Sequence, residues 1–272
     1  MSGRRIAILI EKELREFRAH PALILPVVIL VVVCTLLPLL VIVILPRTMG
    51  QSLATDRGMA QMIEKAQAHL PSLRGLSPQA AAEAFLFQQF LLLFLMAPIV
   101  GAVSLAAYAV VGEKQGRTLE PLLTTPISTS ELLVAKVLAA FLPSIVIEAA
   151  GLAVYFLMVA AIASPGVLHA LLTPRAAVLI VALGPFAALA ALQGTIAISS
   201  RVNDARSAQQ IAVLLVMPLM AMFVGQIAGG FFLSSAMLAL FSAALAGAWV
   251  ILVLLSVALF ERETILTRWD HG

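Results

Sequence analysis

The stretch from Pro21 to Pro46 contains no charged residue. A helix over this stretch is long enough to cross a hydrocarbon core of roughly 30 Å, and it satisfies its own backbone groups in lipid. Pro26 and Pro38 each remove a backbone donor, so we expect the helix to bend locally at both. The stretch predicts a membrane-spanning helix.

Similar apolar runs along the chain predict five further membrane helices. Their approximate limits are 84–111, 129–163, 174–198, 211–232 and 235–260. Ser77-Pro78 and Thr173-Pro174 are typical helix starts and precede the second and fourth runs. Of 272 residues, 62% are hydrophobic and 11% are charged, and the mean hydropathy is +1.07, far from a soluble domain. We predict an all-α integral membrane protein, one transmembrane domain over residues 1–272 with six transmembrane helices.

The distribution of Lys and Arg predicts the orientation. With six spans, the side that holds both termini carries twelve of these residues and the other side carries five. The positive-inside rule then places both termini and the loops 112–130 and 199–210 in the cytoplasm, and the loop 47–83 outside. Because the basic residues lie at helix ends and form no single patch, we expect no nucleic-acid partner despite the net charge of +3.

The first twenty residues predict an amphipathic helix on the membrane surface, because apolar and charged residues alternate at helical spacing. The apolar side holds Ile6, Ile10, Leu14 and Phe17, and the other side holds Glu11, Lys12, Arg15 and Arg18. The apolar stretch is too short for a signal peptide. A second amphipathic helix is expected over Asp56–Leu70, where it is either a lid over the outer mouth or a surface connector.

A few polar residues and glycines within the apolar runs are candidate functional or packing residues. Glu148 is the only acidic residue deep in an apolar run, so it either lines a substrate path or is a protonated partner of a neighbouring helix. Gln88 and Gln89 either line the same path or join helices. Gly225 and Gly229 have the G-x-x-x-G spacing that permits close helix packing.

Several functional motifs are absent from the sequence. It has no phosphate-binding G-x-x-x-x-G-K-[ST] loop, so we expect no ATP site on this chain. H-E-x-x-H and G-x-S-x-G are also missing and the four histidines lie outside the apolar runs, so we predict no catalytic residue and no metal site. Cys34 is the only cysteine and cannot form a disulfide within the chain. An ion-coupled secondary transporter that uses Glu148 stays open, and so, with less support, does an intramembrane enzyme.

The longest patterned polar interruption covers residues 111–136, with the sequence V-G-E-K-Q-G-R-T-L-E-P-L-L-T-T-P-I-S-T-S-E-L-L-V-A-K. Thr118 caps a short helix whose first turn tolerates Pro121. Ser128 and Glu131 form a capping box that starts the next membrane helix. The loop therefore predicts a short helix between two spans. One side of it carries Leu119, Leu122 and Leu123.

The pattern E-K-x-x-R-T-L-E-P-L-L-x-T-P-I-S-x-x-E-L-L-x-x-K resembles the loop between the second and third membrane helices of ABC-2-type permeases, the membrane subunits of a class of ABC transporters. In that family the loop is a coupling helix that lies in a groove of a separate ATPase subunit. The resemblance implies that the three leucines fill this groove and that Glu113, Arg117 and Glu120 contact its edge. Residues 199–210, with Arg201 and Asp204, resemble the family's second cytoplasmic helix.

The same resemblance implies an assembly. The first twenty residues are similar to the family's connecting helix, which packs near the ATPase. We expect a two-fold pair of permease chains, taken as a homodimer, with two ATPase subunits that carry ATP and Mg, working as an exporter. The expected place is the cytoplasmic membrane of a bacterium or archaeon, in contact with membrane lipid. Lipid, polysaccharide, peptide, drug and ion all stay open as substrates.

Overall fold

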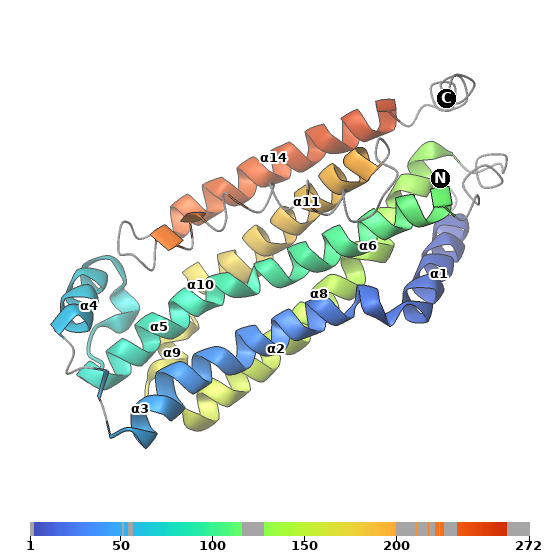
Figure 1. The fold of residues 1–272 in the computed structure, drawn as a ribbon. Helices are drawn as coiled ribbons and strands as arrows, with labels where there is room; N and C mark the ends of the chain where they lie inside the picture. Colours follow the sequence, from blue (N-terminus) through green and yellow to red (C-terminus); the bar gives the residue numbers. More distant parts are fainter. Residues whose placement is uncertain are drawn as a thin grey trace.

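A computed structural model of the chain describes residues 3–50, 52–53, 57–115, 128–199, 210, 217, 221–222, 224–225 and 233–259. Within this part of the chain the regular structure is helical, and the helices form an elongated bundle (Figure 1). Five apolar segments there are long enough to cross a membrane: Leu25–Thr48, Pro78–Ala109, Ser130–Ile162, Pro174–Ser199 and Ser235–Ser256. They correspond to five of the six predicted spans. Most of the remaining one, 211–232, lies outside the described residues.

The two ends of the bundle are built differently (Figure 1). At one end, α1 (Gly3–Ala19) packs against α8 (Thr129–Ile162). At the other end, α4 (Arg57–His69), within the predicted 47–83 loop, packs against α5 (Pro78–Phe94). We refer to these as the α1 end and the α4 end.

The first span changes its winding along its length. After a short turn η1 (Pro21–Leu23), α2 (Leu25–Leu39) continues into the π-helical turn η2 (Leu40–Ile44) and then into α3 (Leu45–Thr48). Pro38 lies inside α2, directly before this π-helical turn. Pro26, where a second bend was expected, lies in the first turn of α2, where its missing N–H has no helical partner to lose.

The second span is interrupted once. It consists of α5 and α6 (Met96–Gln115), which meet at Leu95. The Ser77 hydroxyl accepts a hydrogen bond from the Ala80 backbone N–H at 3.3 Å, so Ser77 caps α5 as predicted. The Leu95 break was not predicted, although Pro98 lies three residues on and has no N–H to bond to the Phe94 carbonyl.

The third and fourth spans start at the predicted caps. Ser128 and Glu131 form both hydrogen bonds of the capping box at the start of α8. Thr173 caps the fourth span, accepting from the backbone N–H of Ala176. This span runs through α10 (Pro174–Val178), the π-helical turn η5 (Leu179–Leu183) and α11 (Gly184–Ser199). The change in winding therefore lies directly before the predicted kink at Gly184-Pro185.

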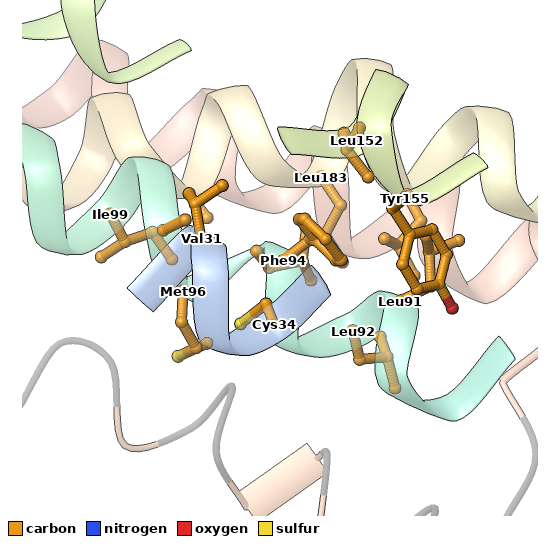
Figure 2. Packing of buried hydrophobic residues seen from close by; sticks show 14 of the residues in the cluster. Val31, Cys34, Leu91, Leu92, Phe94, Met96, Ile99, Leu152, Tyr155 and Leu183 are labelled. Carbon is orange, nitrogen blue, oxygen red and sulfur yellow. The ribbon is translucent and has the colours of Figure 1, made fainter. Parts of the chain in front are cut away.

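The last described helix, α14 (Ser235–Leu259), packs against α11, and α11 in turn packs against α6. The loop between α8 and α10 includes a short helix, α9 (Val167–Leu171). The central core joins α2, α5, α6 and α8 (Figure 2). Within it the hydroxyl of Tyr155 donates to the backbone carbonyl of Phe87 at 2.9 Å, and its ring packs edge-on against Phe87 and Phe94.

Two glycines allow helices to approach closely in this core. A Cβ on Gly151 of α8 would overlap the Val31 side chain of α2, and a Cβ on Gly101 of α6 would lie 2.6 Å from Ser144 Oγ of α8. Both positions therefore exclude a larger residue unless a neighbour moves. Of the predicted packing glycines, Gly225 is helical and half-buried, and Gly229 lies outside the described residues.

Candidate functional site

The first helix packs on the bundle through a buried face that the sequence pattern located only in part. Leu9, Glu13 and Phe17, spaced four residues apart, are buried. The predicted apolar residues Ile10 and Leu14 are only half-buried and lie beside this row. The helix is amphipathic, as predicted. However, it packs against α8 rather than lying only on a membrane surface, and its buried face contains a carboxyl group.

Glu13 forms a buried ion pair with Lys136 of α8. Lys136 Nζ lies 3.0 Å from Glu13 Oε1, and the two side chains are only 3% and 2% exposed. The same ammonium donates a hydrogen bond of 2.6 Å to the backbone carbonyl of Ala109 in α6. Lys12 Nζ lies at the edge, 3.6 Å from Glu13 Oε1. A single lysine side chain therefore joins α1, α6 and α8.

A second contact holds the far end of α1. The Tyr108 hydroxyl of α6 lies 3.3 Å from His20 Nε2, and the centres of the two rings are 5.2 Å apart. The ring of His20 also lies 3.0 Å from the backbone carbonyl of Glu16, measured from Nδ1. We use the name α1 junction for Glu13, His20, Tyr108, Lys136 and the Ala109 carbonyl.

The α1 junction flanks the predicted coupling loop in the sequence. Ala109 precedes the patterned stretch 111–136, and Lys136 is the last residue of that stretch. Among the predicted coupling residues, Glu113 belongs to the last turns of α6. The other predicted ATPase-contact residues lie outside the described residues: Arg117, Leu119, Glu120, Leu122, Leu123, Arg201 and Asp204.

Glu148 lies in the middle of α8 with its side chain only 3% exposed. Its Oε1 has no hydrogen-bond partner among the described residues. It faces Gly184, where an added Cβ would lie 3.6 Å from Glu148 Oε1 and 3.1 Å from the Leu95 side chain. The carboxyl group is therefore next to two irregular points of the bundle, the α5–α6 break and the end of η5. A buried, unpartnered carboxyl group in a membrane span marks a candidate functional position.

Gln88 and Gln89 have different surroundings. The Gln88 amide donates to the Ala170 carbonyl at 2.8 Å and to Ser72 Oγ at 3.1 Å, and it accepts from Arg175 at 3.5 Å. These are contacts of a residue that joins segments at the α4 end. Gln89 is buried, and neither atom of its amide has a partner in the described part of the chain.

A second network at the α4 end is centred on Glu83. Its carboxylate accepts hydrogen bonds from the Ser164 backbone N–H at 2.7 Å, the Ser164 hydroxyl at 3.0 Å and the Gln79 amide at 3.1 Å. Gln79 in turn accepts from Ser52 at 2.7 Å. Glu83 is buried, so the network fixes the start of α5 against the end of α8.

The sequence analysis missed Glu13, Lys136, Glu83 and Arg175 as buried polar residues. One signal was available for Glu13, which lies four residues from both Leu9 and Phe17 and so shares their face. Among the described residues, no group of three or more His, Cys, Asp or Glu side chains is placed to hold a metal ion.

A protein-family model matches most of the chain. The model of the family described as "ABC-2 family transporter protein" matches residues 7–243. No significant match was found among curated proteins or among solved structures. The matched region includes most of α1, the first four described spans and the first part of α14. With several apolar helices of spanning length, the chain is a multi-pass membrane protein, and it belongs to the ABC-2 family of transporter proteins as a permease-type transport subunit.

Proposed function

We propose that this chain is the permease subunit of an ATP-driven exporter and that its α1 end contacts a separate ATPase subunit. The observation that carries the proposal is the α1 junction. It joins α1 to α6 and α8, the two helices that the loop of residues 112–130 connects. A push on this loop would therefore act on three helices together.

The three helices would move together because separating the buried ion pair costs free energy. The ammonium of Lys136 has left water and is held by the Glu13 carboxylate and the Ala109 carbonyl. Removing one partner from such a pair costs roughly 3–5 kcal/mol. Small displacements of the loop are therefore passed on to the helices more readily than they break this contact.

The exposed face of α1 supports a protein partner at the same end. Ile8 is 59% exposed. Arg15 forms an ion pair of 2.6 Å with Glu11, and Lys12 forms one of 3.2 Å with Glu16. An apolar side chain surrounded by charged groups is common at protein interfaces with polar rims. We assign this face and the loop leucines to the ATPase, with the α1 end in the cytoplasm.

The proposed transport path passes Glu148 and Gln89. Both side chains are buried within spans without partners among the described residues. Glu148 also lies next to Gly184, where the winding changes from π-helix to α-helix. A substrate or a proton that satisfies these groups would stabilise an open arrangement of the helices. In the complete assembly, two permease chains pair with two ATPase subunits that bind ATP and Mg.

Purification from native membranes tests this proposal. The expected result is that a Walker-motif ATPase copurifies with the chain and that transport by the reconstituted complex depends on ATP. Transport driven by an ion gradient through the purified chain alone would contradict the proposal and would support the ion-coupled carrier. Membership in the ABC-2 family does not favour that alternative.

A further inference from the structure

The second, third and fourth spans each carry an interior proline near the depth of Glu148. Pro98 lies in α6, three residues after the Leu95 break. Pro143 lies in α8, five residues before Glu148, and Pro185 is the second residue of α11. Each proline lacks the N–H that would bond to the carbonyl four residues earlier, so a helix bends more easily there. The three prolines are therefore candidate hinges.

Contacts between the helices show that these hinges lie at a common depth. A Cβ on Gly184 would lie 3.1 Å from the Leu95 side chain and 3.6 Å from Glu148 Oε1. Nearer the α1 end, a Cβ on Gly101 would lie 2.6 Å from Ser144 Oγ. The irregular points of the three spans thus fall within about two helical turns, a length of roughly 11 Å. We use the name hinge level for residues 95–98, 143–148 and 184–185.

On the α4 side of the hinge level, hydrogen bonds tie the three spans together. Glu83 of α5 accepts from the backbone and the hydroxyl of Ser164, which directly follows the α8 cap. The Tyr155 hydroxyl of α8 donates to a backbone carbonyl of α5 at 2.9 Å. The Gln88 amide of α5 donates to the Ala170 carbonyl of α9, just before the fourth span. We call α5, α9, α10, η5 and the part of α8 after Glu148 the α4-side unit.

On the α1 side, the same three spans are held by separate contacts. Lys136 of α8 bonds to Glu13 of α1 and to the Ala109 carbonyl of α6, and α11 packs against α6. Glu148 lies between the two sets of contacts, and its Oε1 has no hydrogen-bond partner among the described residues. A bend at the hinge level therefore leaves the hydrogen bonds of both sides intact.

We propose that the α4-side unit turns as one body about the hinge level and that this motion uncovers Glu148. A bend in one span requires bends in the other two, because the hydrogen bonds of the unit would otherwise break. The carboxyl group is covered by Leu95 and Gly184, which belong to the two spans that bend beside it. The first span crosses this depth as a continuous helix, α2, against which the unit turns. The motion belongs to this chain and does not depend on ATPase coupling or on the direction of transport.

Distances between pairs of spin labels measure this motion. Cys34→Ala removes the only native cysteine, and the full chain is studied in lipid nanodiscs. Labels are attached to cysteines introduced at three exposed positions. Leu157 of α8 and Val181 of η5 lie in the α4-side unit, whereas Val250 of α14 lies beside the α1-side parts of α8 and α11. We expect a narrow distance distribution for Leu157–Val181, and a second population in both distances to Val250.

Pro98→Ala tests whether the unit moves as one body. The new N–H bonds to the Phe94 carbonyl and stiffens the second span, which carries no label. Both distances to Val250 should nevertheless lose their second population by roughly fivefold, the effect of one restored backbone hydrogen bond. Pro38→Ala is the control, because Pro38 is an interior proline of the first span outside the hinge level, and it should change neither distance.

The reactivity of a cysteine at position 148 tests whether the motion uncovers that position. In the Cys34→Ala background, Glu148→Cys should react with a small polar thiol reagent, and roughly fivefold more slowly when Pro98→Ala is added. Thr195→Cys is the control, since Thr195 is buried in α11 away from the hinge level, and its rate should not respond to Pro98→Ala. An unchanged rate at position 148 would show that the motion does not uncover Glu148.

The one-body motion is contradicted if Pro98→Ala leaves both distances to Val250 unchanged, or if Leu157–Val181 is as broad as they are. Should Pro98→Ala not fold, Gly184→Ala decides. It adds a methyl group against Leu95 in the fourth span, and the Leu157–Val250 pair has no label on that span. This pair should lose its second population, and an unchanged distribution would overturn the proposal. All of these measurements are made without an ATPase, so their failure leaves the test of the exporter unaffected.

Discussion

The buried pair of Glu13 and Lys136 is the residue-scale feature that defines the α1 end. A buried ion pair is not in itself strong support for high stability, because desolvation of both charges offsets most of their attraction. The importance of the pair is that it fixes the positions of the helices. The ammonium has a carboxylate on α1 and a carbonyl on α6, so α1 is held in one position relative to both helices.

This geometry predicts that removing one charge, replacing both residues by apolar ones and exchanging the two charges have different effects on stability. Glu13→Gln should lower the free energy of unfolding by up to roughly 3–5 kcal/mol, since Lys136 loses its buried counter-charge. Glu13→Leu combined with Lys136→Met should regain most of that loss. Exchanging the two charges should not, because a carboxylate at position 136 would face the Ala109 carbonyl. Thermal unfolding in detergent measures all of these variants.

Lys12→Met is the control for this series. Lys12 also lies near Glu13, but it is at the edge with a side chain 35% exposed, so the change should cost less than about 1 kcal/mol. Equal stability of the charge-exchanged variant and the parent protein would show that the Ala109 carbonyl does not fix the direction of the pair.

Replacing Glu148 is expected to impair transport without affecting stability or assembly. Glu148→Gln keeps the shape and removes the titratable charge, and no described hydrogen bond is lost. We expect normal stability and assembly but impaired transport with an altered pH profile. Glu83→Gln is the matched control, because that carboxylate accepts three hydrogen bonds and its loss should cost roughly 1–3 kcal/mol in stability. Unchanged transport across pH in Glu148→Gln would remove Glu148 from the path.

At the scale of helices, local signals in the sequence predicted where elements begin. Ser77, Ser128 with Glu131, and Thr173 each cap the helix that they were expected to cap, because a cap depends on residues within one turn. The break at Leu95 and the π-helical turns η2 and η5 each lie close to a proline in the sequence, Pro98, Pro38 and Pro185 respectively. A proline indicates that the helix is disturbed nearby, but not whether the chain breaks or forms a π-helical turn, and the break at Leu95 was not predicted.

Contacts between distant segments were the least predictable part of the candidate site. Glu13 and Lys136 are separated by 123 positions, and nothing near either residue indicates the other. The close approaches at Gly101 and Gly151 were missed for the same reason. Gly225 and Gly229 were chosen because they match a known spacing, whereas Gly101 and Gly151 act singly against a side chain of another helix.

The glycines give a prediction at this scale. Gly151→Ala should lower the free energy of unfolding by roughly 1–3 kcal/mol, because the added methyl group overlaps Val31 between α8 and α2. Gly247→Ala is the control within α14. A Cβ there meets nothing within 4 Å, so the change should be neutral or should stabilise by about 0.5–1 kcal/mol through helix propensity. Similar unfolding temperatures for the two variants would contradict the close α2–α8 contact.

For the whole molecule, the two ends of the bundle are held together by different contacts. The α4 end is fixed by hydrogen bonds of Glu83 and Gln88 that connect segments far apart in the sequence. The α1 end is fixed by the α1 junction and flanks the loop proposed to receive the ATPase. Lipid-facing α14 completes one side, with large exposed apolar side chains such as Leu240 and Leu254. This division fits a transporter that receives force at one end and opens or closes a path at the other.

The recovery of ATPase per permease chain tests the central claim most directly. Burying one leucine side chain contributes roughly 1.5–3 kcal/mol, so changing Leu122 and Leu123 together to Ser should remove about 3–6 kcal/mol and lower subunit affinity by two or more orders of magnitude. Glu120→Lys is the control, since an edge charge affects association more than the packed contact. We predict that the double serine variant inserts normally but loses both copurification and transport-linked ATP hydrolysis, while Glu120→Lys retains most of the ATPase. Normal levels of both in the double serine variant would contradict the account.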